Sequence, residues 1–205
     1  MSLVIDNKLP DNNLINDKHD DVDNKNNNSH AEGSGTTASG ECSHAEGIDT
    51  LADGDYSHAE GSNTTASGEN AHAEGYNTTA LGKYSHAEGI DTEALDNGSH
   101  AEGINTLSEG NGSHAEGINT LAEGNGSHAE GIDTTAEGNC SHTEGYYTNA
   151  SGCYTHAGGY YTIADYDNMT AIGKYNISDD EELITIRKNK LFVVGNGNEK
   201  NRMDA

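Results

Sequence analysis

Histidine recurs at one fixed interval through most of this chain, and that interval limits the folds open to it. Ten of the eleven histidines stand fourteen residues apart, from His30 to His156, and only His19 lies outside the series. Each opens a unit that reads Ser-His-Ala-Glu-Gly with few substitutions, such as Ala71 and Thr155 in the Ser place. Self-similarity at a fixed period is typical of solenoids, in which each unit packs only on its neighbours.

The second half of each unit repeats the same pattern more loosely, as Thr-x-Ala-x-Gly, for example at residues 120–124. Alternation over five residues followed by Gly indicates a strand and a turn, and a glycine about every seven residues rules out a helical coiled coil. The sequence therefore predicts an all-β fold, a β-solenoid with 14-residue coils. At about 4.8 Å per strand, ten coils would make a rod roughly 50 Å long.

Three regions follow from where the period holds. Residues 29–173 are predicted to form a β-roll of ten coils plus a degenerate eleventh. Residues 1–28 are rich in Asp, Asn and Lys without a period, which is typical of a leader that is disordered or ordered by a partner. Residues 174–205 contain two short β runs, at 183–187 and 190–194, which predict a hairpin-like cap or the start of a further domain.

Strand alternation divides the side chains of each coil between two faces. It places Ser, Ala and Gly of the first heptad inward, together with the Thr series from Thr36 to Thr162, and His and Glu outward. Only small side chains fit so thin a cross-section, and inward hydroxyls need backbone partners. Glycine is expected to permit positive φ at the corners, and Asp96, which replaces one such glycine, tolerates that conformation. An inward Thr series argues against an ice-binding surface.

The outward positions of the two heptads behave differently. The first heptad holds His and Glu almost without change, whereas the second shows unrelated pairs such as Leu51 with Asp53 and Glu93 with Leu95. Variable positions suit open solvent. A constant surface predicts contact with one recurring environment, for which another copy of the same rod is the simplest source, and hence a symmetric homo-oligomer.

The Ser-x-Ala-x-Gly heptads of residues 29–173 resemble the head repeats of trimeric autotransporter adhesins of the YadA type. The resemblance implies a left-handed parallel β-roll that forms a homotrimer, with the two outward places of the first heptad around the threefold axis. The family usually carries Val and Ile there, whereas this chain carries His and Glu, and only residues 169–173, Met-Thr-Ala-Ile-Gly, return toward the family form.

The His and Glu variant, with residues 172–176 and 192–197, also resembles phage and prophage tail-fibre proteins of Gram-positive bacteria, in which a self-cleaving chaperone domain often follows. The trimer interface that these resemblances predict consists of the outward first-heptad residues and of Ile172. They are His30, Glu32, His44, Glu46, His58, Glu60, His72, Glu74, His86, Glu88, His100, Glu102, His114, Glu116, His128, Glu130, His142, Glu144, His156 and Ile172.

Other functions fit the residues less well. The His-x-Glu pattern offers nitrogen and oxygen ligands, and threefold symmetry could bring three His together around a metal ion. Catalysis is disfavoured because neighbouring Ser and His point to opposite faces of a strand, and tenfold repetition is unlike an active site. In most coils an apolar residue, such as Ile48 or Tyr76, occupies the corner after the first Gly, and it suits packing between coils or between chains better than a sugar-binding platform.

Composition excludes several partners. A net charge of −25 argues against nucleic acid, which requires clustered Lys and Arg, and no apolar run suits a transmembrane helix or signal peptide, so no membrane insertion is expected. Three cysteines, Cys42, Cys140 and Cys153, do not make a disulfide framework.

We expect an extracellular fibrous module, an adhesin head or a phage tail-fibre shaft, that binds a host-cell receptor or glycan. A structural spacer without a receptor is the alternative. The sequence assigns no catalytic residue, cofactor or metal ligand.

Overall fold

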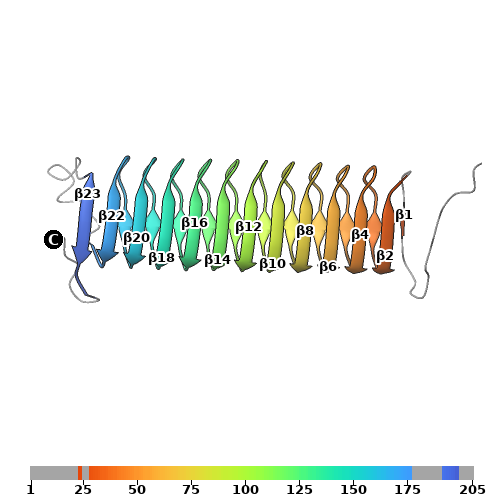
Figure 1. Cartoon of the computed structure of the whole chain (residues 1–205), viewed down its shortest axis with the longest axis horizontal. Coiled ribbons are helices and arrows are strands. Elements are labelled where there is room, and N and C mark those ends of the chain that lie inside the picture. Colours follow the sequence, from red (N-terminus) through yellow and green to blue (C-terminus); the bar gives the residue numbers. More distant parts are fainter. Residues whose placement is uncertain (1–22, 25–27, 177–190, 199–205) are drawn as a thin grey trace, which may run out of the picture.

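The computed structural model describes residues 23–24, 28–176 and 191–198, and these form a parallel β-solenoid (Figure 1). Successive coils stack along the long axis of the molecule in sequence order. Each coil adds one strand to each of two sheets, so from β1 to β22 every strand pairs with the strand two places away in the chain, and β23 pairs with β22. The described residues contain no helix. The predicted fold class, an all-β solenoid with 14-residue coils, is confirmed.

One sheet has twelve strands, each of five residues. They are β2 (His30–Ser34), β4 (His44–Ile48), β6 (His58–Ser62), β8 (His72–Tyr76), β10 (His86–Ile90), β12 (His100–Ile104), β14 (His114–Ile118), β16 (His128–Ile132), β18 (His142–Tyr146), β20 (His156–Tyr160), β22 (Thr170–Lys174) and β23 (Phe192–Asn196).

The other sheet has eleven strands, each of two residues. They are β1 (Asp23–Asn24), β3 (Thr37–Ala38), β5 (Leu51–Ala52), β7 (Thr65–Ala66), β9 (Thr79–Ala80), β11 (Glu93–Ala94), β13 (Leu107–Ser108), β15 (Leu121–Ala122), β17 (Thr135–Ala136), β19 (Asn149–Ala150) and β21 (Ile163–Ala164).

Register follows the repeat. In the long-stranded sheet His86 lies opposite His100 and Ile90 opposite Ile104, and in the short-stranded sheet Glu93 lies opposite Leu107. From β1 to β22 every pairing joins residues fourteen apart, so like residues lie over like residues along the rod. The short second strand differs from the expectation of two five-residue strands, because the chain turns at the second-heptad Gly almost at once.

Small side chains fill the interior, as alternation predicts. The Ala columns of both heptads are buried, with Ala45, Ala101 and Ala122 at 0% exposure, and the Ser and Thr columns are buried beside them. Thr36 through Thr162 all point inward, which contradicts an ice-binding role for this column. The core therefore consists of side chains no larger than Thr along most of the rod, since nothing bulkier fits between the two sheets.

Inward hydroxyl groups meet the expectation of backbone partners only in part. Several of the Ser column donate to the carbonyl oxygen three residues earlier, as Ser43 does to Gly40 at 2.8 Å and Ser113 to Gly110 at 2.6 Å. The Thr column differs, since Oγ1 of Thr36, Thr50 and the equivalent residues to Thr162 has no hydrogen-bond partner among the described residues.

Glycine serves these coils mainly by its lack of a Cβ atom. First-heptad glycines such as Gly47 have φ between 103° and 128°, and a Cβ there would overlap the carbonyl oxygen of the next coil's glycine, Gly61. Second-heptad glycines such as Gly40 do not have positive φ, yet a Cβ would overlap the backbone of the next coil in the same way. Left-handed backbone at the corners falls instead on residues such as Asp49 (φ 53°) and Tyr56 (φ 59°). The expectation that the glycines supply the corners was therefore wrong for the second heptad.

Asp96, which replaces a second-heptad glycine, likewise does not have left-handed backbone. Its φ is not positive, and the left-handed residue of that corner is Gly98 (φ 64°), so tolerance of left-handed backbone does not explain the substitution. Its carboxylate instead accepts the N–H of Asn97 at 2.7 Å, and its carbonyl oxygen accepts the hydroxyl of Ser99 at 2.6 Å. Tyr166 also stands in a glycine place, in the last coils, where it packs against the apolar cluster that contains Met169.

Both ends extend beyond the predicted boundaries. Residues 23–24, which belong to the predicted leader, form β1 and pair with β3; the rest of that leader up to residue 22 lies outside the described residues. At the other end β23 adds to β22 in parallel, with Val193 opposite Ala171 in the buried column. The other run of the predicted hairpin, 183–187, lies outside the described residues, so the hairpin stays a prediction.

Asn176 closes the short-stranded sheet. It occupies the Thr column and is fully buried, and its side-chain amide accepts the N–H of Ile163 and donates to the carbonyl oxygen of Ile163, both at 2.8 Å. The amide thereby replaces the hydrogen bonds that a further strand would make to β21.

Candidate functional site

The outward residues of the long-stranded sheet form two parallel rows, which we call the His–Glu face. It contains the nineteen His and Glu residues predicted for the interface, from His30 to His156, with Ile172 at its end in the Glu row. The strands bring them together because residues two apart on a strand share a face and because the register places each coil's His beside the next. The structure thus makes one continuous surface of these residues.

The ten imidazoles of this face stack into one column. Their ring centroids lie 4.5 to 5.1 Å apart, the spacing of the strands that carry them. The rings of the central coils are almost parallel, with an interplanar angle of 1° between His114 and His128. The ladder register alone determines this order, since each ring stands directly over the equivalent ring of the neighbouring coil.

Eight carboxylates of the face, from Glu46 to Glu144, lie beside a histidine of the same chain. In seven coils, from His44 and Glu46 to His128 and Glu130, Nε2 and Oε2 of the same strand lie 3.6 to 3.9 Å apart. Where Gly158 replaces the glutamate, Nε2 of His156 instead lies 3.4 Å from Glu144 of the previous coil. These contacts lie within one chain, and contact of the same residues across chains stays a prediction.

Burial and stacking disfavour the protonated imidazole. Burial, more than the neighbouring histidines His58 and His30, lowers the pKa of His44, while Glu46 and Glu60 oppose the shift. The pKa values of five further histidines are lowered in the same way, with burial as the largest cause: His72, His86, His100, His114 and His142. The column is therefore mainly uncharged at neutral pH at these positions.

A row of large apolar side chains runs alongside the His–Glu face. It occupies the last residue of the same strands, and its members are 40% to 55% exposed: Ile48, Tyr76, Ile90, Ile104, Ile118, Ile132 and Tyr160. In the last coils Tyr146 stacks on Tyr160 at 5.2 Å, and a second stack of Tyr147, Tyr161 and Tyr175 lies beside it. The sequence placed this row at a corner and expected it to pack between coils or between chains, whereas the structure places it at the end of the same strands that carry His and Glu.

The outward side of the short-stranded sheet has no such constancy. Leu51 and Thr65 are half-buried, and Glu93 is exposed. Three glutamates form a short row there, and burial followed by the charges of Glu137 and Glu109 raises the pKa of Glu123. This side is chemically mixed, as the sequence predicted.

Two other features of the described residues bear on function. Cys42, Cys140 and Cys153 are free thiols. None of the described segments is a helix long and apolar enough to span a membrane.

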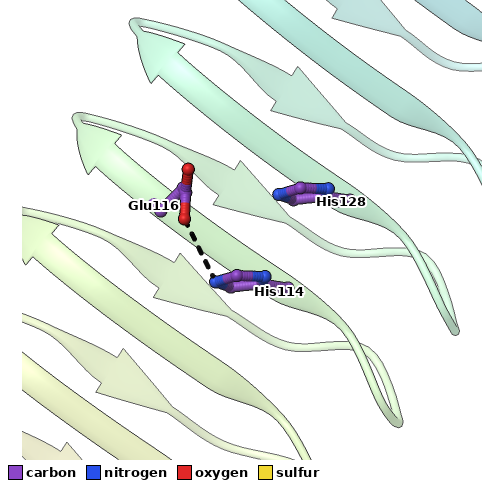
Figure 2. Close-up of side chains that lie close together, drawn as sticks. All are labelled: His114, Glu116 and His128. Atoms are coloured by element: carbon purple, nitrogen blue, oxygen red, sulfur yellow. Dashed lines mark ion pairs between the residues drawn. The ribbon is translucent and has the colours of Figure 1, made fainter.

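Metal-ligating atoms converge in two places on the His–Glu face. One ligand atom each from His114, Glu116 and His128 lie within 4.8 Å of one another, and the same holds for His128, Glu130 and His142. Figure 2 shows the first group, in which the carboxylate of Glu116 stands beside the two parallel rings.

Comparison with protein families gives one match. The model of the YadA head domain repeat (2 copies) matches residues 59–85, 101–127 and 115–139, all within the solenoid. A search of curated proteins finds no match. The matched residues include the strands from β6 to β9 and from β12 to β17, which carry the central part of the His–Glu face.

Proposed function

We propose that this chain, whose coils are head repeats of the YadA type, forms a homotrimer of left-handed β-rolls joined through the His–Glu face and the adjoining apolar row. The match of residues 59–85 and 101–139 to the YadA head repeat supports an adhesin-type fibrous surface module, exposed outside the cell. Adhesins with such heads form homotrimers and bind host surface components. We assign the same function to this chain, namely that of a trimeric rod that binds a cell surface.

The observation that carries the assembly is the unbroken face of the long-stranded sheet. A row of exposed Ile and Tyr runs along most of the rod, interrupted by Ser62, and exposed apolar strips of this kind mark protein contacts. Beside it the six imidazoles with a lowered pKa are largely uncharged, so their burial against another chain costs less than the burial of cations. The opposite side, with unrelated outward residues, offers no repeated contact.

Charge explains why the histidines are needed there. The chain has a net charge of −25, so three rods side by side repel one another. The side chains of the glutamates on the face are 35% to 54% exposed, which leaves each carboxylate free to accept a hydrogen bond from a neighbouring chain. The imidazole column beside the Glu row, uncharged at the six positions where the pKa is lowered, offers neighbouring chains a surface without added negative charge.

Mass in solution tests the assembly. Light scattering after gel filtration is expected to give three chains per particle, and a monomer would refute this use of the face. Glu102→Arg places a cation on the face, and Glu93→Arg makes the same change on the other side of the rod. We expect the first variant to weaken the trimer and the second to leave it intact. Equal behaviour of the two would show that chains meet elsewhere.

Binding to a surface is tested separately. The trimer is applied to a glycan array and to intact cells, with the variable outward residues of the short-stranded sheet as the candidate contact. Saturable binding supports an adhesin head or a receptor-binding tail fibre. A trimer that binds neither is a spacer, the alternative that uniform repeats serve equally well.

A further inference from the structure

We propose that the middle of the His–Glu face binds one divalent transition-metal ion of the Zn²⁺ type, through His114, Glu116 and His128 or through His128, Glu130 and His142. Sequence reasoning assigned no metal ligand, although it noted that His-x-Glu offers nitrogen and oxygen ligands and that a threefold axis could bring three His together. Here every ligand comes from a single chain, so the inference does not depend on the trimer. Because both groups contain His128, they compete for one ion.

The ligand atoms are close enough to share an ion after small movements. Nε2 of His114 lies 3.6 Å from Oε2 of Glu116, and all three ligand atoms of each group lie within 4.8 Å (Figure 2). A point equally far from three such atoms would be about 2.1 to 2.8 Å from each, against roughly 2.0 to 2.2 Å for zinc bonds to nitrogen and oxygen. Shifts of a few tenths of an ångström close the difference in distance, and the direction of the lone pairs requires a further rotation of the rings.

The central coils differ from the others in where their carboxylates lie. The side chains of Glu116 and Glu130 are 42% and 35% exposed, whereas those of Glu60, Glu88 and Glu102 are 49% to 54% exposed. Glu116 and its His114 also make the shortest contact within one strand among the described pairs. The same motif thus brings oxygen and nitrogen closest in β14, whereas β16, with 3.9 Å between His128 and Glu130, differs in the lower exposure of its carboxylate.

The nitrogen atoms are available as ligands. Nε2 of His114, His128 and His142 is shielded from solvent and has no hydrogen-bond partner among the described residues. A buried polar atom without a partner is costly, and a metal ion would satisfy it. Two imidazole nitrogens and one carboxylate oxygen suit Zn²⁺, Cu²⁺ or Ni²⁺, whereas Ca²⁺ and Mg²⁺ require mainly oxygen ligands.

Binding requires the two rings to tilt. They are parallel within 1°, so the in-plane lone pairs of His114 and His128 do not converge as the rings stand. The χ2 angle of histidine is broad, which makes this rotation accessible. The tilt breaks one step of the imidazole stack, so metal binding is expected to disturb the column locally and to leave the other coils in place.

Equilibrium dialysis of the full chain against Zn²⁺, after treatment with a chelator, tests the site. We expect one Zn²⁺ per chain and no retention of Ca²⁺. His128→Phe keeps a ring in the column but removes the nitrogen common to both groups, and it should weaken Zn²⁺ binding at least about tenfold. His72→Phe is the matched control, because it makes the same change in a coil outside both groups, and it should bind Zn²⁺ as the unmodified chain does.

A double variant, Glu116→Gln with Glu130→Gln, removes both carboxylates and leaves the imidazole stack in place. It should show the same loss of Zn²⁺ binding, so the site can be tested even if His128→Phe does not fold. Three results would each overturn the proposal: no zinc binding, about one ion for every histidine pair, or equal losses of zinc binding in His128→Phe and His72→Phe. Light scattering on the same samples separates this result from the assembly: a trimer that does not bind zinc refutes the metal site alone.

Discussion

Gly103→Ala should lower the free energy of unfolding of the rod strongly. Gly112→Ala, nine residues away, should lower it much less. Both glycines have positive φ, 123° and 62°. A Cβ at Gly103 would overlap the carbonyl oxygen of Gly117 in the next coil, while a Cβ at Gly112 meets no atom within 4 Å. The two variants therefore separate the steric demand of the stacked coils from the conformational demand of one residue.

The magnitudes follow from these two demands. Backbone at φ 123° costs a non-glycine residue about 1 to 3 kcal/mol. Relief of the overlap with Gly117 moves β12 away from β14 and weakens ladder hydrogen bonds worth about 0.5 to 1.5 kcal/mol each. We expect a loss of about 3 to 5 kcal/mol for Gly103→Ala. At Gly112 only the left-handed penalty of about 1 to 2 kcal/mol applies, and the chain itself places Tyr56 and Cys140 at the equivalent position.

Urea unfolding followed by far-ultraviolet circular dichroism measures both losses. Hydrogen exchange of β12 and β14 shows whether the damage is local, as expected where each coil packs only on its neighbours. The reasoning fails if Gly103→Ala is no more destabilising than Gly112→Ala, because the glycine would then be needed for its backbone conformation alone.

Two further predictions concern the histidine column and the buried residue Asn176. Because the pKa values of His44, His72 and His86 are lowered below the ordinary value of about 6.5, the unfolded chain takes up protons more readily, and stability is lost as the pH falls below about 6.5. The melting temperature should be steady from pH 9 to 7 and fall toward pH 5; a constant value over the whole range would contradict the shifts. Asn176→Ala should cost about 1 to 3 kcal/mol, because it leaves the N–H and carbonyl groups of Ile163 without the side-chain partners that they have now, and faster amide exchange at Ile163 than in the interior strands would accompany that loss.

Much of the fold could be predicted because one rule repeats. A fourteen-residue period and alternation around Ala45 or Ala101 determine the coil, the register and the inward columns, since any slip would turn His and Glu into the core. The length of the second strand could not be read in this way. Its two residues reflect how closely Gly40 approaches the next coil, a contact between backbones that no side-chain pattern records.

The candidate site was predicted in its membership and missed in its chemistry. Spacing placed every His and Glu on one face, but it did not show that Glu116 approaches His114 of its own strand more closely than its counterparts do. Such differences arise from side-chain rotamers among nearly identical coils. The apolar row was visible as Ile48, Ile90 and Ile104, and was assigned to a corner because alternation was counted only as far as the first Gly.

The uniform register allows the number of coils to change by whole units. Residues 98–111 and 112–125 differ only in Ser108 against Ala122, and both occupy the same buried column. Unequal recombination between the segments that encode them adds or deletes one whole coil, and the flanking coils then meet in the register they already use. Each event changes the reach of the rod by about 4.8 Å and creates no new interface. Reach can therefore vary between related strains in small, equal steps, without selection having to rebuild the fold each time.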